Sequence, residues 1–253
     1  MTVLLIDVGN TRIKWARLQG ADLRRASAAV HANWRTEEYA RRLIGAVPPE
    51  RILVSSVAGP AVRAALTRMA RRSRVPVSFV KVPARRAGIT VGYADAWRLG
   101  VDRFIGMVAA HHLFRGVPVC VAGIGTALTL DLIARSGRHF GGAIIPGPGL
   151  MVETLLSGTW GIRRRAWGGR RTGRGPFGRS TRAAIEAGAH YAAAALIDRA
   201  VDEGTALVGR PPLVVLTGGG AEGVRPLVHS PAVGVPDLVL RGLAVLAAQP
   251  RAR

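Results

Sequence analysis

The sequence predicts an α/β fold with two similar halves, and three observations carry this prediction. Apolar runs of strand length alternate with amphipathic segments of helix length along most of the 253 residues, which is typical of layered α/β domains. Residues 3–18 form an apolar run, a glycine turn and a second alternating run, and residues 119–133 repeat this design. The two turn glycines, Gly9 and Gly125, lie about 116 residues apart. This spacing indicates a duplicated domain.

The first half opens with a hairpin and continues with alternating strands and helices. We expect strands at 3–7 and 12–18, a turn at 8–11, a short helix at 37–47, a strand at 51–59, a helix at 61–73 and a strand at 75–82. Residues 97–114 carry Val101, Ile105, Val108 and His112 at helical spacing. The first half therefore matches an α/β layer.

The second half begins with the repeated hairpin at 119–133. A strand and a Gly-Pro turn leading into a helix are expected at 140–151. Residues 157–181 are rich in Gly and Arg and lack periodicity, which predicts a long mobile loop. The following helix should be capped at Ser180 or Thr181 and run to about Arg199. A strand, a triple-glycine turn and a helix start are expected at 211–224, and a closing helix at 236–249.

The composition excludes several classes of protein. Apolar residues make up 49% of the chain, which is typical of a globular protein and not of a disordered one. No apolar run reaches the roughly 18 residues that a membrane helix needs, and no signal-peptide pattern is visible at the start. The single cysteine, Cys120, excludes a disulfide framework and is expected to be a buried small hydrophobe. We expect a cytoplasmic protein.

The net charge of +21 allows two interpretations. A nucleic-acid partner or an anionic small substrate would favour a basic surface. Coding bias is the alternative, because Lys14 and Lys81 are the only lysines and arginine supplies the other basic side chains, as in a product of a GC-rich genome. We expect bias to account for most of the charge, so that a functional share would be local.

The segment LLIDVGNTRIKWA, residues 4–16, contains the parts of a phosphate site. Asp7 ends an apolar strand, where a carboxylate can hold Mg²⁺ directly or through water. The turn 9–11 can offer backbone N–H groups to an anion, and Lys14 on the outgoing strand can neutralise a transferred phosphoryl group. The alternative is a plain hairpin with an Asp-stabilised turn. Two further glycine turns after strands, in GIGTALT and TGGGAE, favour the phosphate site.

An ordered set of motifs gives the chain its resemblance to a known family. DVGNT, GVDR, GTALTLD, GGAIIPG and TGGG follow one another over almost the whole chain, and their order and spacing resemble those of type III pantothenate kinase. The resemblance implies two ribonuclease-H-like domains of the acetate kinase, hexokinase and actin superfold around a nucleotide cleft. We place these domains at 1–115 and 116–253, with the last helix able to pack back on the first domain. It also implies phosphorylation of pantothenate to 4′-phosphopantothenate by ATP, the first step of coenzyme A biosynthesis.

The resemblance implies a role for each matching position. Asp102 would be the general base, Asp7 would lie near Mg²⁺, and Thr126 would contact ATP phosphate. The ATP and phosphate set is Asp7, Val8, Gly9, Asn10, Thr11, Arg12, Ile13, Lys14, Thr126, Gly218 and Gly219. The pantothenate set is Tyr93, Gly100, Val101, Asp102, Arg103 and Thr181. From the residues alone, the cap of the helix that begins there is the favoured interpretation of Asp102.

The resemblance also implies a homodimer and a monovalent cation, K⁺ or NH₄⁺. In the family an Asp of the second hairpin takes part in binding that cation, but Gly123 stands at this position and offers no side-chain ligand. The cation requirement is therefore left open, and Asp131 lies too far along the outgoing strand to replace the missing acid. The alternative to an enzyme is a regulatory, nucleic-acid-associated accessory protein on the same fold, which the basic charge keeps open.

The basic segment 163–179 has three interpretations: a solvated loop, a lid that brings positive charge over the substrates, or an arginine-rich nucleic-acid segment. Trp160, Trp167 and Phe177 are too few for a stacking platform, so a nucleic-acid partner is not expected. The six histidines show no metal-ligand spacing, and zinc is not expected.

Overall fold

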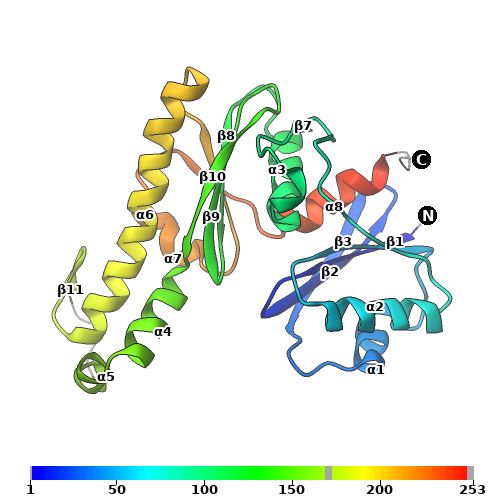
Figure 1. Cartoon of the computed structure of the whole chain (residues 1–253), viewed down its shortest axis with the longest axis horizontal. Coiled ribbons are helices and arrows are strands. Elements are labelled where there is room, and N and C mark those ends of the chain that lie inside the picture. The colour runs from blue at the N-terminus through cyan, green and yellow to red at the C-terminus, as the bar shows by residue number, and fades with distance from the viewer. Residues whose placement is uncertain (1, 169–172, 250–253) are drawn as a thin grey trace. The chain divides into compact units, whose positions relative to one another are not determined.

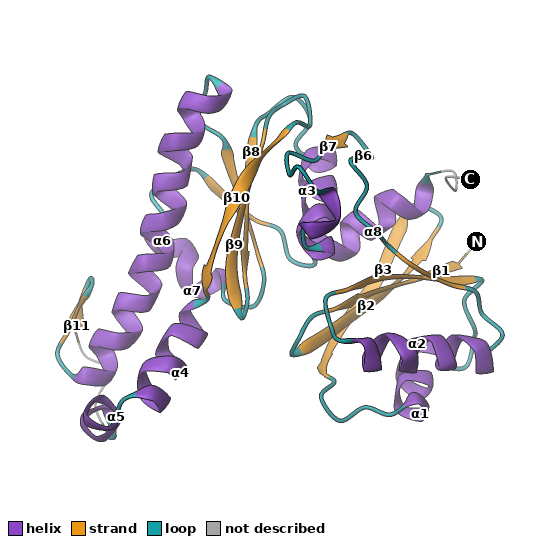
Figure 2. Ribbon diagram, in the orientation of Figure 1, coloured by secondary structure: helices purple, strands orange, loops and turns teal. Residues whose placement is uncertain are grey.

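The computed structural model describes residues 2–168 and 173–249. The chain forms two compact units, each built on one five-stranded sheet (Figures 1 and 2). The first unit takes the chain up to Arg115 and again from Asp237 onward, and the second takes Gly116–Pro236. The closing helix therefore belongs to the first unit.

The first sheet has the strand order β3-β2-β1-β4-β5. Its strands are β1 (Thr2–Val8), β2 (Arg12–Gln19), β3 (Asp22–Val30), β4 (Arg51–Ser56) and β5 (Val77–Phe79). The first three strands form an antiparallel meander, while β4 runs parallel to β1 and β5 parallel to β4. A small separate hairpin pairs β6 (Arg85–Arg86) with β7 (Ile89–Thr90).

Helices cover both faces of this sheet (Figure 1). They are α1 (Thr36–Tyr39), which continues as a π-helical turn at Ala40–Ile44, α2 (Pro60–Arg72), α3 (Val101–Leu113) and α8 (Leu238–Ala248), with a 3₁₀ turn at Ala96–Arg98. Leu4 and Ile6 share a core with Leu66 and Met69 of α2. Helices α3 and α8 pack against each other and contact the same sheet. Because β1 is covered on both sides, its sequence is apolar without alternation until Asp7.

The second sheet repeats the order of the first, as β10-β9-β8-β13-β14. Its strands are β8 (Val119–Ile124), β9 (Ala127–Ile133), β10 (His139–Pro146), β13 (Leu213–Thr217) and β14 (Ala232–Gly234). The helices of this unit are α4 (Pro148–Gly158), α5 (Trp160–Ala166), α6 (Thr181–Val208) and α7 (Ala221–Val224), followed by a 3₁₀ turn at Arg225–Leu227. Ala193, Ile197 and Val201 of α6 form the core against β8, β9 and β13. The two sheets have the same strand order, which confirms the predicted α/β fold with two ribonuclease-H-like halves.

Three local predictions need correction. The edge strand β3 was not expected from the sequence, which assigned no element to residues 22–30. The segment 157–181 is not one irregular loop: it contains α5 and the small hairpin of β11 (Gly173–Arg174) and β12 (Phe177–Gly178), while residues 169–172 of this segment lie outside the described part. Helix α6 runs to Val208 instead of ending near Arg199, and the left-handed Gly209 ends it.

Two other predictions are confirmed. Ser180 caps α6, since its Oγ accepts a hydrogen bond from the Ala183 N–H at 3.1 Å. Cys120 is buried in β8, and burial raises the pKa of its thiol to about 12, so it packs as an apolar group. Within the described ranges, no helix has both the length and the apolar character to cross a bilayer.

Candidate active site

The first unit brings Asp7, Lys14 and Ser55 side by side at one end of its sheet. Asp7 pairs with Lys14 across the antiparallel β1–β2 ladder and with Ser55 across the parallel β1–β4 ladder. Directly opposed residues point their side chains to the same face of a sheet. The neighbours Ile6 and Val8 are fully buried, whereas Asp7 is partly exposed. The strand therefore delivers the carboxylate to the edge of the core.

Four charged groups interact around Asp7. Burial raises the pKa of Asp7 to about 6; the neighbouring Ser55 hydroxyl opposes this rise, the negative charge of Asp102 adds to it, the positive charge of Lys14 opposes it and the negative charge of Asp237 adds to it. We call Asp7, Lys14, Asp102 and Asp237 the Asp7 cluster. They come from β1, β2, the start of α3 and the residue before α8, so four segments of the first unit meet here.

Lys14 is paired with Asp237. Its Nζ lies 3.1 Å from Asp237 Oδ1, and the two side chains are each about one-third exposed. Asp237 is 223 residues away in the sequence, and no pattern in the sequence identified it. Its role at this site was therefore missed.

The GVDR motif forms the first turn of α3. Gly100 is the N-cap residue and Val101 the first residue of the helix. The Arg103 N–H donates to Asp102 Oδ1 at 2.8 Å, but Asp102 lies inside the first turn and makes no capping hydrogen bond, so the capping alternative is wrong. A Cβ on residue 100 would lie 2.8 Å from the same oxygen, so glycine leaves room for this carboxylate.

Arg103 and Tyr93 complete this group. The Arg103 side chain is almost fully buried, and its Nη1 donates to the Tyr93 hydroxyl at 3.1 Å. Its guanidinium also lies 5.8 Å from the centre of the Tyr93 ring, within cation–π range. The structure thus brings together Tyr93, Gly100, Val101, Asp102 and Arg103.

The turn after β1 is tight and exposed. The Gly9 N–H donates to the Arg12 carbonyl at 2.9 Å, and the side chains of Asn10, Thr11 and Arg12 are exposed. The side chains of Val8 and Ile13, in contrast, are fully buried. These two residues can offer a ligand only their backbone.

The buried His31 holds this turn and was not predicted. Its Nε2 lies 2.9 Å from the Gly9 carbonyl oxygen, and its Nδ1 lies 3.2 Å from the Tyr39 hydroxyl. A carbonyl only accepts, so Nε2 carries the proton in this arrangement. A lone histidine between a strand and a loop gives no sequence signal for such a contact.

In the second unit, three glycine turns pack against the end of β8. Gly125 and Thr126 connect β8 to β9, and the Gly147 N–H donates to the Thr126 carbonyl at 2.8 Å. The Gly220 N–H donates to the Ile124 carbonyl at 3.0 Å. Gly218 adopts φ +95°, and a Cβ there would lie 2.2 Å from the same carbonyl oxygen. The structure therefore brings Thr126, Gly218 and Gly219 together at the ends of the neighbouring strands β8 and β13.

The β8–β9 hairpin lacks charged side chains at the two positions where the β1–β2 hairpin carries Asp7 and Lys14. Gly123 pairs with Thr129, as Asp7 pairs with Lys14, and a Cβ on residue 123 would lie 2.9 Å from Thr129 Oγ1. Asp131 is buried further along β9, 3.0 Å from His139 Nε2. Position 123, where the family carries a cation-binding acid, thus has no side-chain oxygen. The Asp131 carboxylate is instead paired with His139.

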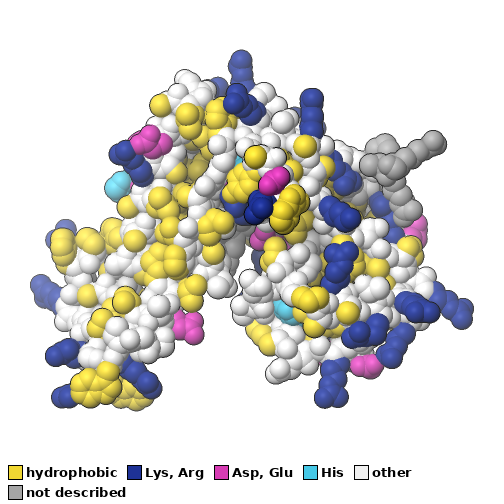
Figure 3. Space-filling model, in the orientation of Figure 1, with side chains coloured by type: hydrophobic (Ala, Val, Ile, Leu, Met, Phe, Trp, Pro, Cys, Tyr) yellow, Lys and Arg dark blue, Asp and Glu magenta, His cyan; other side chains and the backbone are white. Residues whose placement is uncertain are grey.

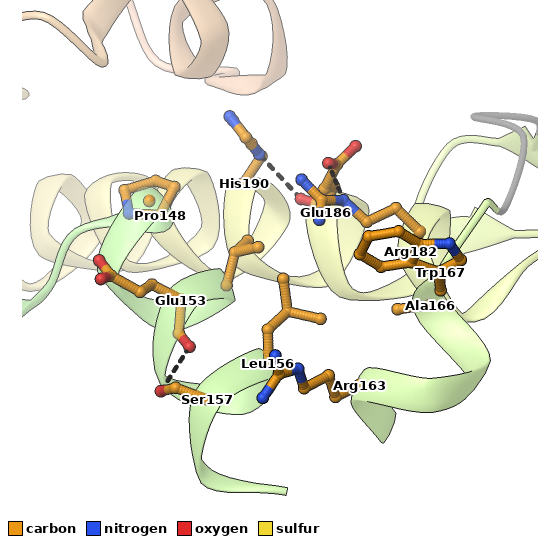
Figure 4. Close-up of a pocket in the computed structure, with 12 residues that line it drawn as sticks. Pro148, Glu153, Leu156, Ser157, Arg163, Ala166, Trp167, Arg182, Glu186 and His190 are labelled. Atoms are coloured by element: carbon orange, nitrogen blue, oxygen red, sulfur yellow. Dashed lines mark hydrogen bonds and ion pairs between the residues drawn. The ribbon is translucent and has the colours of Figure 1, made fainter. Parts of the chain in front are cut away.

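A cavity of about 770 Å³ lies between α4, α5 and α6 of the second unit (Figure 4). Leu156, Trp167, Arg182 and His190 are among its lining residues. Arg182 Nε lies 2.6 Å from Glu186 Oε1, and His190 Nδ1 lies 2.8 Å from the Glu186 carbonyl oxygen. None of the predicted site residues lines this cavity, although Thr181 precedes Arg182 at the start of α6.

Solved structures of similar fold define the class of this protein. A Baf family transcriptional activator from Campylobacter jejuni matches with a TM-score of 0.63 and 17% identity over 96% of this chain and 97% of that one. Component A of (R)-2-hydroxyglutaryl-CoA dehydratase from Acidaminococcus fermentans matches with a TM-score of 0.56 and 14% identity, over 97% of this chain and 95% of that one. A glucokinase from an Antarctic psychrotroph matches with a TM-score of 0.50 and 11% identity, over 97% of this chain and 98% of that one. The fold is that of the acetate kinase, hexokinase and actin superfold.

Sequence comparison then gives the family. The family model described as type III pantothenate kinase matches residues 3–203. The type III pantothenate kinase of Nitrosococcus oceani is 36% identical, over 97% of this chain and 93% of its own length. The type III pantothenate kinase of Laribacter hongkongensis is 37% identical, over 97% of this chain and 98% of its own length. The chain belongs to the type III pantothenate kinase family, whose members transfer a phosphoryl group from ATP to pantothenate in coenzyme A biosynthesis.

Proposed function

We propose that the Asp7 cluster and the group around Arg103 carry out the ATP-dependent phosphorylation of pantothenate, with Asp102 as general base. The observation that supports this most directly is that Asp7 lies close enough to both Asp102 and Lys14 in one unit to interact with their charges. A base, an acid able to bind Mg²⁺ and a cation for phosphate are the groups that phosphoryl transfer to an alcohol requires.

The reaction needs one proton acceptor. The pantothenate hydroxyl loses its proton to the Asp102 carboxylate while its oxygen bonds to the γ-phosphorus, and the bond from that phosphorus to the bridging β–γ oxygen breaks, releasing ADP. Because the transition state is loose, positioning and neutralisation of charge supply most of the rate enhancement. We assign pantothenate binding to Tyr93, Gly100, Val101 and Arg103, with Thr181 contributing from the start of α6.

We propose phosphate contacts within each unit, taken by itself. In the first, Lys14 would neutralise the transferred group, and residues 8–13 would offer backbone N–H groups and the exposed side chains of the turn. In the second, Thr126 would contact phosphate, and Gly218 and Gly219 would lie by the adenosine. We also propose that the two units are the two domains of the enzyme, with α8 completing the first.

The residues present fit a magnesium ion that arrives with ATP. Asp7 supplies a partly exposed carboxylate oxygen at the strand end, the ligand type that Mg²⁺ prefers. The described residues hold no cluster of three or more acidic, His or Cys ligands, which suits an ion that keeps several waters and is held mainly by the substrate phosphates. When bound, the ion would neutralise phosphate charge.

The residues present do not fit a monovalent cation site that relies on an acid at position 123. Gly123 has no side-chain oxygen, and Thr129 fills the space above it. We therefore propose that turnover does not depend on potassium or ammonium. We place the reaction in the cytoplasm, because the chain belongs to a family of metabolic kinases that use ATP.

We propose that the enzyme is a homodimer. Exposed aromatic side chains on and beside α5 support this proposal, because Trp160 and Trp167 are 76% and 88% exposed and Phe177 is 78% exposed. In Figure 3, hydrophobic side chains cover the α5 end of the second unit, with Lys and Arg around them. Clustered exposed aromatics are typical of protein interfaces.

The experiment that tests this function is ADP release by the purified protein with ATP, Mg²⁺ and pantothenate, compared with Asp102→Asn. We expect turnover that depends on pantothenate and a fall in kcat of about 10²- to 10⁴-fold in the variant, because the base is lost. Asp95→Asn is the matched control, since Asp95 binds only the exposed Arg98 just before the motif. Its rate should stay near that of the wild type.

Running the assay in sodium, potassium and ammonium tests the cation proposal at the same time. Equal rates in the three salts are expected, and strong activation by potassium or ammonium would contradict it. Absence of turnover in every salt, from folded protein, would contradict the kinase function. Binding of DNA or RNA that weakens with salt and that ATP does not displace would then favour the accessory-protein alternative.

A further inference from the structure

Asp237 occupies a helix N-cap position without capping the helix. It immediately precedes α8, yet its side chain makes no capping hydrogen bond. Aspartate at an N-cap usually accepts a hydrogen bond from the first turn, which stabilises the helix by about 1 kcal/mol. The helix start is held by the backbone, since the Arg241 N–H donates to the Asp237 carbonyl at 3.1 Å. The carboxylate is therefore not used for helix stability.

The backbone of Asp237 is strained as well. Its φ of +56° and ψ of +31° lie in the left-handed region, which costs a non-glycine residue free energy. Only three non-glycine residues in the described part of the chain have positive φ. In this conformation the carboxylate reaches Lys14 Nζ at 3.1 Å. Strain of this kind is maintained where the surrounding structure fixes it, often at functional sites.

Lys14 is a side chain that needs a second contact to define its position. A lysine ammonium sits on a flexible four-carbon stem, and ordering it costs conformational entropy. Asp7 is directly opposite on β1, but Lys14 forms its ion pair with Asp237. The ion pair with Asp237, just before α8, together with the attraction of Asp7 on the neighbouring strand, limits where the ammonium can point.

We propose that Asp237 is a positioning residue for phosphoryl transfer, which holds the Lys14 ammonium beside Asp7 where the transferred phosphoryl group arrives. This inference rests on the proposed function of the Asp7 cluster. It assigns to the closing helix a part in catalysis: the chain returns to the first unit and supplies the counter-charge for the lysine of the first hairpin. An incidental surface ion pair between exposed side chains would matter little, since such pairs stabilise by about 0–1 kcal/mol.

The kinetic test is a double-mutant cycle of Asp237→Asn and Lys14→Gln. Asparagine tolerates the left-handed conformation, so the melting temperature of Asp237→Asn should match that of the wild type. We expect kcat to fall about tenfold with little change in the KM for pantothenate, because a misplaced charge affects the transition state more than substrate binding. In the Lys14→Gln background the same substitution should change kcat less than about twofold.

Asp22→Asn is the matched control, because Asp22 forms an exposed ion pair with Arg24 on the same sheet, away from the cluster. It should leave kcat unchanged. The positioning role is overturned if Asp237→Asn keeps kcat within about twofold of the wild type. It is also overturned if the fold-loss is equal in both backgrounds, since Asp237 then acts independently of Lys14.

A second readout does not depend on activity. Lys14 and Lys81 are the only lysines, so side-chain ¹⁵N labelling gives two ammonium signals, with the exposed Lys81 as internal reference. Asp237→Asn should shift the Lys14 signal and increase its mobility, leaving Lys81 unchanged; an unmoved Lys14 signal overturns the proposal. If the wild type does not phosphorylate pantothenate, the proposed function fails, and this comparison alone decides whether Asp237 orders Lys14.

Discussion

Asp7 shows what it costs to place a carboxylate at the end of a buried strand. An ordinary aspartate has a pKa near 3.8, and in this protein burial raises the pKa of Asp7 to about 6. The folded state therefore binds the proton more tightly than the unfolded state does. By linkage, Asp7 is most compatible with folding below about pH 4, where it is protonated in both the folded and the unfolded state. This stability is lost as the pH rises from about 4 to about 6. At neutral pH the charged Asp7 destabilises the free protein.

The first prediction at this scale concerns Asp7→Asn. A shift from 3.8 to about 6 corresponds to a cost of up to about 3 kcal/mol, which asparagine does not incur. We expect the variant to be inactive, and to unfold in urea with a higher free energy than the wild type at pH 8. The difference should shrink toward zero near pH 4. A variant that is less stable than the wild type at pH 8 would contradict the raised pKa of Asp7.

Other single residues could not be found from the sequence for a physical reason. Asp237 and His31 act through contacts 223 and 22 residues away along the chain, and no local pattern encodes such contacts. Asp7 and Lys14 could be predicted from the residues, because strand, turn and outgoing strand are consecutive, whereas Asp102 and Arg103 were predicted from the family resemblance of GVDR. The structure adds that these motifs share one unit, while their roles stay proposals.

At the level of elements, close packing of turns depends on particular glycines. A Cβ on Gly147, which precedes α4, would lie 2.1 Å from the Gly125 carbonyl oxygen and 3.0 Å from that of Thr126. Only glycine lets the turn after β10 pack on the turn after β8. The backbone around Thr126 is therefore shaped by a residue that contacts no proposed ligand.

Gly147→Ala tests this dependence. The added methyl group must push the two turns apart, which should lower the free energy of unfolding by about 1–3 kcal/mol and raise the KM for ATP. Gly149→Ala is the matched control, because a Cβ there meets nothing within 4 Å and the residue lies in the first turn of α4. It should unfold at the same urea concentration as the wild type or at a slightly higher one. Equal stability of the two variants would show that the packing of the turns is not limiting.

Elements with a buried apolar face were predicted well, and elements without one were missed. β1, α2, α3 and β8 each carry such a face. β3 is an edge strand of small and basic residues, largely exposed along its length, so it has no hydrophobic alternation to recognise. α5 was hidden by its flanking glycines and by Arg163–Arg165. The tertiary partner of such segments, and not their own sequence, decides their structure.

On the scale of the whole molecule, the two units share a strand order but not a chemistry. The hairpin of the first unit carries the pair of Asp7 and Lys14, and the hairpin of the second carries Gly123 and Thr129 at the corresponding register. Both hairpins keep the turn glycine, whose N–H donates to the first residue of the next strand at 2.9 Å. The same turn hydrogen bond is thus present in both hairpins, while the pair of an acid and a lysine is present only in the hairpin of the first unit.

The last prediction concerns assembly. If the exposed aromatics around α5 form the dimer interface, replacing Trp160 and Trp167 together by Glu should place charge in an apolar contact and weaken dimerisation by at least about 100-fold. Light scattering after size-exclusion chromatography should give twice the chain mass for the wild type and the chain mass for this variant. Trp97→Glu is the matched control, since Trp97 is 71% exposed in the first unit and lies 4.7 Å from the Arg98 guanidinium; it should remain dimeric. A wild type that is monomeric at micromolar concentration would contradict the dimer, and a variant that stays dimeric would place the interface elsewhere.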